Sequence, residues 1–223
     1  MKKIYFLSLF TCSMLLIGGK GALLRIDNLD DLLKEMENHE ETITTMKFNF
    51  IQTLSLKGAR GDVQESTGKA YFKKPMSVRV EHLKPEKNIF ITNGKDAWYY
   101  APAFKQVMVG SWEELGDNAG NFFKGLLNAN GYLQDMRDTY TFVFEGRQDA
   151  YYMLTMYPKI KKKDYFEMKL WIDSQYFYPC KTELILDTMT IQTVLQKVTF
   201  NNDLPESLFL FDMPSNVEQM SFP

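Results

Sequence analysis

The stretch from Gly68 to Val107 constrains the fold of this 223-residue chain most strongly. From Met76 to Glu81, apolar and polar side chains alternate, and a period of two places successive side chains on opposite faces of a strand. Asn93-Gly94 separates the extended runs 89–92 and 97–100, and both residues tolerate the positive φ that tight hairpin turns require. The stretch therefore predicts an antiparallel meander with one face toward water.

The same alternation recurs along most of the chain. It begins at Met46, and both faces of several later strands carry large apolar groups, so that some of them should contact helices or line a cavity. About ten or eleven neighbouring strands tend to curl into a barrel or split into packed sheets. Outside the meander and the Met46 strand, strands are expected at 140–145, 151–157, 165–173, 181–186, 190–200 and 208–211.

Two helical regions interrupt the strand pattern. Between Asn28 and Met46, apolar residues recur at helical spacing, and Asp27 or Asn28 can cap the first turn, which predicts an amphipathic helix. From residue 111 to 138 the alternation stops, and an apolar segment broken by Gly, Asn and Asp predicts short helices. A connection of this length often forms a lid. The alternative is that it plugs one end of a barrel.

The N-terminal residues 1–21 have the layout of a secretory signal peptide, with two lysines, an apolar run and then small residues. Residues 22–223 are then expected to form a single domain that includes the lid. Cys12 lacks the preceding small residue that lipidation requires, and its removal would leave Cys180 as the only thiol. Loss of three lysines with this segment shifts the net charge from −2 to −5, which argues against general binding of nucleic acids or anionic membranes.

Catalytic and metal-binding motifs are absent from the sequence. His39 and His82 are the only histidines, and neither belongs to a metal-ligand motif, while no serine lies in a glycine elbow. We therefore expect no catalytic residues, no metal and no cofactor. A hydrolase that uses acidic residues is the weaker alternative. The chain has 13 Met and 17 Phe, and such side chains suit either an ordinary core or an interior that accepts an apolar ligand.

An ordered series of motifs resembles the periplasmic lipoprotein carrier family LolA. The motifs include F-x-F-x-Q (48–52), G-K-A-Y-F-K-K-P (68–75), I-T-N-G-K-D-A-W-Y-Y (91–100), P-x-x-K-Q-V (102–107), L-W-I-D (170–173) and the closing N-N-D-L-P with F-x-F-x-x-P (201–214). The resemblance covers nearly the whole chain after the leader. It implies a mainly β (α+β) fold, an unclosed antiparallel β-barrel with an N-terminal helix and a lid of short helices.

The resemblance also implies a function without catalysis. Carriers of this kind receive acylated lipoproteins from an ATP-driven exporter of the inner membrane, shield the acyl chains across the periplasm and deliver them to an outer-membrane acceptor. Binding of nucleic acid is not expected, and the carrier is expected to be a monomer. The alternative on the same scaffold is an envelope-stress module that binds lipid or lipoprotein as a signal.

Site residues are carried over onto this chain as expectations. In several family members an arginine before the proline of the K-x-P turn contacts the lid, and here that position is Lys74, with Arg79 as the other candidate latch. Because a slip of one residue inverts the faces of a strand, the assignment depends on register. The expected cavity residues are Phe48, Phe50, Val78, Val80, Ile91, Trp98 and Leu170, and the expected lid residues are Phe122, Phe123, Leu126 and Leu127.

Overall fold

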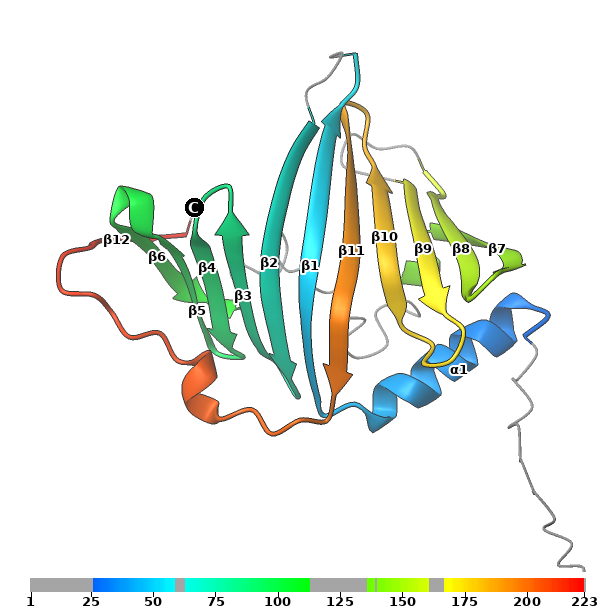
Figure 1. Ribbon diagram of the computed structural model, residues 1–223, viewed down its shortest axis with the longest axis horizontal. Coiled ribbons are helices and arrows are strands. Elements are labelled where there is room, and N and C mark those ends of the chain that lie inside the picture. Colours follow the sequence, from blue (N-terminus) through cyan, green and yellow to red (C-terminus); the bar gives the residue numbers. More distant parts are fainter. Residues whose placement is uncertain (1–25, 59–62, 113–135, 139, 161–166, 223) are drawn as a thin grey trace, which may run out of the picture.

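The computed structural model describes residues 26–58, 63–112, 136–138, 140–160 and 167–222. These residues form one 12-stranded sheet in the order β12-β6-β5-β4-β3-β2-β1-β11-β10-β9-β8-β7 (Figure 1). The sheet is not closed, because β12 and β7 remain its two edges. The expected mainly β architecture with an open antiparallel sheet and an N-terminal helix is therefore confirmed.

Two meanders meet in the middle of the sheet. β1 pairs with β2 on one side and with β11 on the other, so the last long strand of the chain returns to lie beside the first. The strands are β1 (Thr45–Leu56), β2 (Val63–Lys73), β3 (Ser77–Lys84), β4 (Asn88–Asn93), β5 (Asp96–Ala101), β6 (Gln106–Ser111), β7 (Tyr140–Gln148), β8 (Tyr151–Pro158), β9 (Glu167–Asp173), β10 (Pro179–Ile185), β11 (Met189–Phe200) and β12 (Glu218–Ser221).

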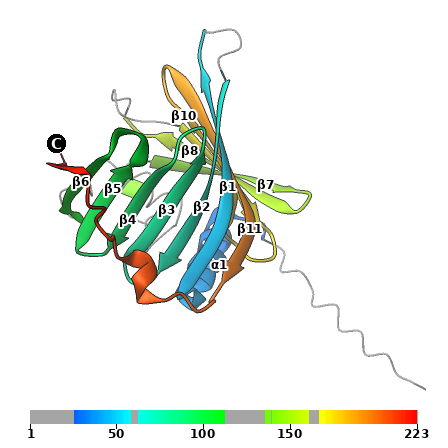
Figure 2. The ribbon, with the colours of Figure 1, turned by 60° about the vertical axis from the view of Figure 1, so that its left-hand side comes forward.

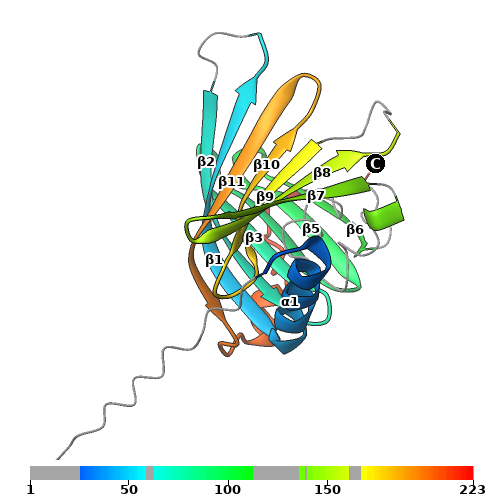
Figure 3. The same cartoon turned by 90° about the vertical axis from the view of Figure 1, so that its right-hand side faces the viewer.

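The helix α1 (Leu29–Thr42) begins where the sequence predicts. The side chain of Asn28 accepts a hydrogen bond from the Asp31 backbone N–H at 2.9 Å and caps the first turn. The buried residues of α1 are Leu32, Leu33 and Met36, and they pack against β8 and β9. The sheet curves around the helix (Figure 3). The face of the sheet that contacts α1 is called the inner face below.

The C-terminal segment, residues 201–222, lies on the other face of the sheet, the outer face. It crosses β3 and β4 and then adds β12 parallel to β6 (Figure 2). The predicted strand at 208–211 is wrong, because Glu206–Phe209 form the 3-10 helix η3. A single turn, closed by Leu208 N–H donating to the Pro205 carbonyl, lets Phe209 point into the sheet with 1% of its surface exposed.

Short 3-10 turns also occur at Pro102–Phe104 (η1) and Met136–Asp138 (η2). Most of the predicted lid at 111–138 lies outside the described residues. So does the predicted signal peptide, residues 1–21. Within the described ranges, no helix combines the length and the apolar character needed to span a bilayer.

Candidate functional site

The inner face carries the two apolar clusters of the structure. The first cluster, called the β1–β6 cluster, comes mainly from one half of the sheet. Its buried members are Ile43, Met46, Phe48, Phe50, Ala70, Phe72, Val78, Val80, Phe90, Ala97, Trp112 and Leu195. The second, called the helix cluster, joins α1 to the other half, and its buried members are Ile26, Leu32, Leu33, Met36, Tyr140, Tyr152, Leu154, Met156, Met168, Leu170 and Ile172.

Strand register places both clusters on one continuous surface. Residues opposite each other in antiparallel strands point to the same face. Phe50 pairs with Leu195 across β1 and β11, and Thr182 of β10 pairs with Leu170 of β9. Thr193, which shares its face with Leu195, pairs with Thr182. The apolar inner face therefore extends from β6 to β7, interrupted by buried threonines at its centre.

Gly68 makes room for the aromatic ring of Phe50 on this surface. A Cβ at residue 68 would lie 2.2 Å from Phe50 Cζ and 2.4 Å from the Glu81 carbonyl oxygen, so only glycine fits between β1 and β3. The Phe50 ring crosses above Gly68 and meets the His82 ring edge-on, at 5.2 Å between centroids. Burial there lowers the pKa of His82, which favours the neutral imidazole on this apolar face.

Two polar contacts link α1 to other elements, one to the turn after β2 and one to η2. At its C-terminal end, Lys74 Nζ donates to the Glu40 carbonyl oxygen at 2.7 Å, and at its N-terminal end Arg137 Nη2 lies 3.0 Å from Asp30 Oδ1. A cation near the last carbonyls of a helix also interacts favourably with the helix dipole. The described residues on either side of 113–135 are Trp112 and η2. Trp112 belongs to the β1–β6 cluster and Arg137 of η2 contacts α1, so both lie on the inner-face side.

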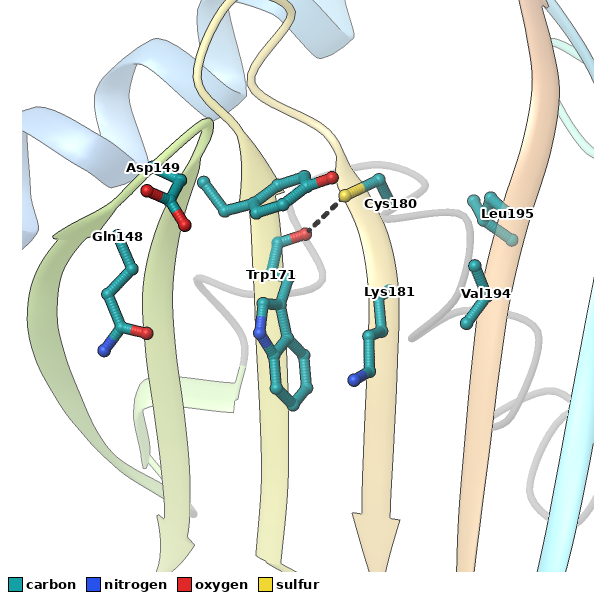
Figure 4. A pocket seen from close by; sticks show the side chains of 8 residues that line it. Gln148, Asp149, Trp171, Cys180, Lys181, Val194 and Leu195 are labelled. Carbon is teal, nitrogen blue, oxygen red and sulfur yellow. Dashed lines mark hydrogen bonds between the residues drawn. The ribbon is translucent and has the colours of Figure 1, made fainter.

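On the outer face, residues from β7 to β11 line a hollow of about 370 Å³ (Figure 4). The Lys181 ammonium lies 4.1 Å from the centroid of the Trp171 ring, and the Cys180 thiol donates to the Trp171 carbonyl at 3.2 Å. Burial raises the pKa of Cys180 to about 11, so the thiol stays protonated and is a poor nucleophile. In the described part of the chain, no group of three or more His, Cys, Asp and Glu is placed to hold a metal ion.

A family model described as outer membrane lipoprotein carrier protein LolA matches residues 41–212. The chain belongs to the LolA family. It is 25% identical over 192 residues to the outer-membrane lipoprotein carrier protein of Pasteurella multocida, with 84% of this chain and 86% of that protein covered. The carrier protein of Haemophilus ducreyi is 26% identical over 187 residues, with 83% of each covered.

The fold of this LolA-family chain is also found in a solved structure. An uncharacterized conserved protein from Thermus thermophilus superposes with a TM-score of 0.56 at 15% sequence identity, over 86% of this chain and 98% of that one. At this identity the likeness concerns the fold alone. The open sheet is thus shared by two chains whose sequences differ extensively.

Register separates the expected cavity residues of this LolA-family chain into two groups. Phe48, Phe50, Val78 and Val80 lie together in the β1–β6 cluster, and Leu170 lies in the helix cluster on the same face. Ile91 and Trp98 pair with each other, and Ile91 pairs with Arg79, which places all three on the outer face. The Trp98 ring there stacks on Phe211 of the C-terminal segment at 6.4 Å between centroids.

The two residues expected to latch the lid contact other segments. Lys74 reaches α1, as described above, while Arg79 Nη1 donates to the Leu208 carbonyl at 3.1 Å and Arg79 Nε to Glu81 Oε1 at 2.6 Å. Arg79 therefore holds the C-terminal segment on the outer face. The expected lid residues Phe122, Phe123, Leu126 and Leu127 lie outside the described residues, so a latch function stays a prediction.

Several inner-face residues were missed by reasoning from the sequence. Phe90 and Tyr99, which pair with each other, stand beside the expected Ile91 and Trp98 but point to the inner face. The length of the connection between the paired His82 and Asn88 determines which face each residue of β4 takes. A loop shorter by one residue would turn Ile91 inward. In β5 the inner face carries the fully buried Ala97, whereas its neighbour Trp98 is only partly buried.

Proposed function

We propose that this LolA-family protein is a periplasmic chaperone that binds the acyl chains of lipoproteins on its inner face and carries them from the inner to the outer membrane. The continuous apolar inner face of an unclosed sheet is the observation that carries the proposal. Its relatives are outer-membrane lipoprotein carrier proteins. A carrier of this kind performs no reaction, in keeping with a family of carriers.

The physics of lipid transfer supports this choice. Each acyl CH₂ taken out of water contributes about 0.8 kcal/mol, so a lipoprotein cannot leave a membrane at a useful rate without an apolar surface to receive its chains. We propose that Phe48, Phe50, Val78 and Val80, which are buried among apolar neighbours, form such a surface when lipid takes the place of those neighbours, and that Leu170 extends it toward α1. Carrier binding must remain reversible, and competition between lipid and the protein's own apolar side chains for one surface lowers the net affinity.

The implied partners follow from this pathway. We propose that acylated lipoproteins are the ligand, that an ATP-driven exporter of the inner membrane is the donor and that an outer-membrane receptor is the acceptor. No cofactor, metal or nucleic acid takes part, and the carrier acts as a monomer. The second candidate, a module that binds lipid or lipoprotein as a stress signal, uses the same inner face, and the described structure contains nothing that favours it over the carrier.

Copurification tests the proposal directly. The protein is purified from the periplasm of cells that express the full chain, and mass spectrometry identifies what is bound to it. Acylated lipoprotein is the expected ligand, whereas free lipid alone or an empty protein contradicts the carrier function. Depletion separates the second candidate, since a carrier's loss leaves lipoproteins in the inner membrane and a sensor's loss leaves them correctly localised.

A further inference from the structure

The hairpin connections at one end of the sheet share an unusual surface. Register places them at the same end of the sheet, since Leu56 pairs with Met189, Ile89 with Tyr100, and Ile185 with Glu167. They lie along the upper edge of Figure 1, opposite the C-terminal end of α1. This end of the sheet is called the tip end, and its described connections comprise residues 56–58 with 63, 83–88, 102–105, 158–160 and 186–188.

Large apolar side chains project into solvent from four of these five connections. The exposed fraction is 65% for Phe104, 64% for Ile160, 59% for Val63, 40% for Leu56 and 38% for Leu83. None of these residues belongs to either inner-face cluster. Exposed apolar side chains that recur in several connections at the same end of a sheet favour an interaction site at that end.

A lysine stands next to an exposed apolar residue in each of the four connections. The adjacent pairs are Leu56-Lys57, Leu83-Lys84, Phe104-Lys105 and Lys159-Ile160. All four lysines are exposed, and so is Lys87 in the β3–β4 connection. Lys159 Nζ also donates to the Arg137 carbonyl at 2.6 Å. The described connections carry these five lysines against Glu86 and Asp187, and Glu218 lies beside Lys105. Positive charge therefore exceeds negative charge there, although the whole chain carries −2.

The opposite end of the sheet has a different composition. Its described connections are 74–76, 94–95, 149–150 and 174–178. The exposed large apolar residues at or beside them are Tyr151 and Tyr176, and both carry a hydroxyl group. Of the two ends of the sheet, the tip end therefore holds the exposed aliphatic and phenyl groups.

We propose that the tip end docks onto an anionic phospholipid surface. Phe104, Ile160 and the other apolar tips enter the boundary between headgroups and acyl chains, while the neighbouring lysines extend their ammonium groups back to the lipid phosphates. Net charge argues against membrane binding only as an average over the molecule. Here the positive charge stands at the end where the apolar groups project, and a lipid surface complements both.

Charge and apolar contact contribute separately to such docking. Each lysine near an anionic bilayer strengthens binding about fivefold, and the contribution disappears as salt screens the surface. Each apolar tip adds affinity in proportion to the area that it buries. We therefore expect weak, salt-sensitive association, which lets a protein visit a membrane and leave it.

Vesicle flotation tests this inference without any lipoprotein present. The protein purified from the periplasm is first freed of copurified lipoprotein by washing in detergent. It is then mixed with phosphatidylcholine vesicles that do or do not contain phosphatidylglycerol. Wild type should float with the anionic vesicles and remain at the bottom of the gradient with the neutral ones. Lys84→Glu and Phe104→Ser should each weaken flotation, by about fivefold or more for the lysine.

Matched controls change the same chemistry elsewhere. Lys95→Glu alters an exposed lysine at the opposite end, and Leu210→Ser alters a side chain of the C-terminal segment that is 56% exposed; both should float as wild type does. The inference is overturned if wild type does not float, if it floats equally with neutral vesicles, or if the controls lose as much binding as the tip variants. A further outcome also overturns it: the tip variants float normally, and a photo-crosslinker at position 104 captures a membrane protein. The tip end would then dock on that protein instead of on lipid. Because the vesicles carry no lipoprotein, a failure here leaves the carrier function untouched.

Discussion

Lys73 and Lys74, consecutive in the chain, fasten two segments on opposite faces of the sheet. Lys74 Nζ donates to the Glu40 carbonyl at the end of α1, whereas Lys73 Nζ bonds to the Leu204 carbonyl and to Glu206 of the C-terminal segment. Side chains of successive strand residues point to opposite faces, so one turn at the end of β2 can hold both segments. The two lysines at the end of β2 thus connect α1 and the C-terminal segment to the same point of the sheet.

Lys74→Leu removes the contact with α1. The Glu40 carbonyl then loses a charge-assisted hydrogen bond, and we expect the free energy of unfolding to fall by about 1 to 3 kcal/mol. Urea unfolding of the purified protein measures this loss. Lys74→Arg keeps a cation within reach of the carbonyl and should recover most of it. Wild-type stability in Lys74→Leu would show that α1 is held without this lysine.

Arg79→Met should loosen the C-terminal segment. It removes the hydrogen bond to the Leu208 carbonyl and leaves Glu81, whose side chain is 23% exposed, without its cation. Loss of the bond to a charged group predicts a destabilisation of about 1 to 3 kcal/mol. Hydrogen exchange should rise in residues 204–211 and stay unchanged in α1. Faster exchange in α1 instead would mean that the contact of Arg79 with the C-terminal segment also affects the contact of Lys74 with α1.

Photo-crosslinking on β5 tests which face receives lipid. Trp98 and Tyr99 are neighbours in sequence but lie on opposite faces, and Tyr99 packs against the β1–β6 cluster. A benzophenone amino acid at position 99 should crosslink to acylated lipoprotein in the periplasm, and the same group at position 98 should not. Equal crosslinking from both positions, or crosslinking from 98 alone, would contradict binding on the inner face.

Strand identity was easier to predict than strand face. The alternation in β3 and the Asn93-Gly94 signal are local, and they located the hairpins. The turn itself consists of Gly94 and Lys95, between the last residue of β4 and the first of β5. The face of Ile91 depends instead on the number of residues that connect β3 to β4. Phe209 escaped prediction because its 3-10 turn is stabilised by packing on a sheet that no local pattern reveals. Phe48, Phe50, Val78 and Val80 were grouped correctly, since long alternating strands fix their relative faces.

Gly68→Ala should disturb the surface under Phe50. The Phe50 ring can rotate away from an added methyl group, but the Glu81 carbonyl belongs to the backbone of β3 and cannot. We expect a loss of about 1 to 3 kcal/mol in unfolding free energy, as for other overpacked sites. The double variant Gly68→Ala, Phe50→Ala measures the share due to the ring. If the single variant is as stable as wild type, the strands separate more easily than this register implies.

His82 should make stability depend on pH in one direction. Burial lowers its pKa in the folded state below the ordinary value of 6.5, so the unfolded chain takes up a proton first as the pH falls. The stabilisation from the neutral imidazole is complete above pH 6.5 and is lost as the pH falls through the folded-state pKa. His82→Gln stays neutral throughout. The carboxylates and His39 titrate in both proteins, so their effects cancel in the difference in urea unfolding free energy between wild type and this variant. That difference should therefore shift against wild type between pH 7.5 and pH 5. A difference that is constant with pH would mean that the imidazole reaches solvent when it is protonated, and that the Phe50 contact does not hold it on the apolar face.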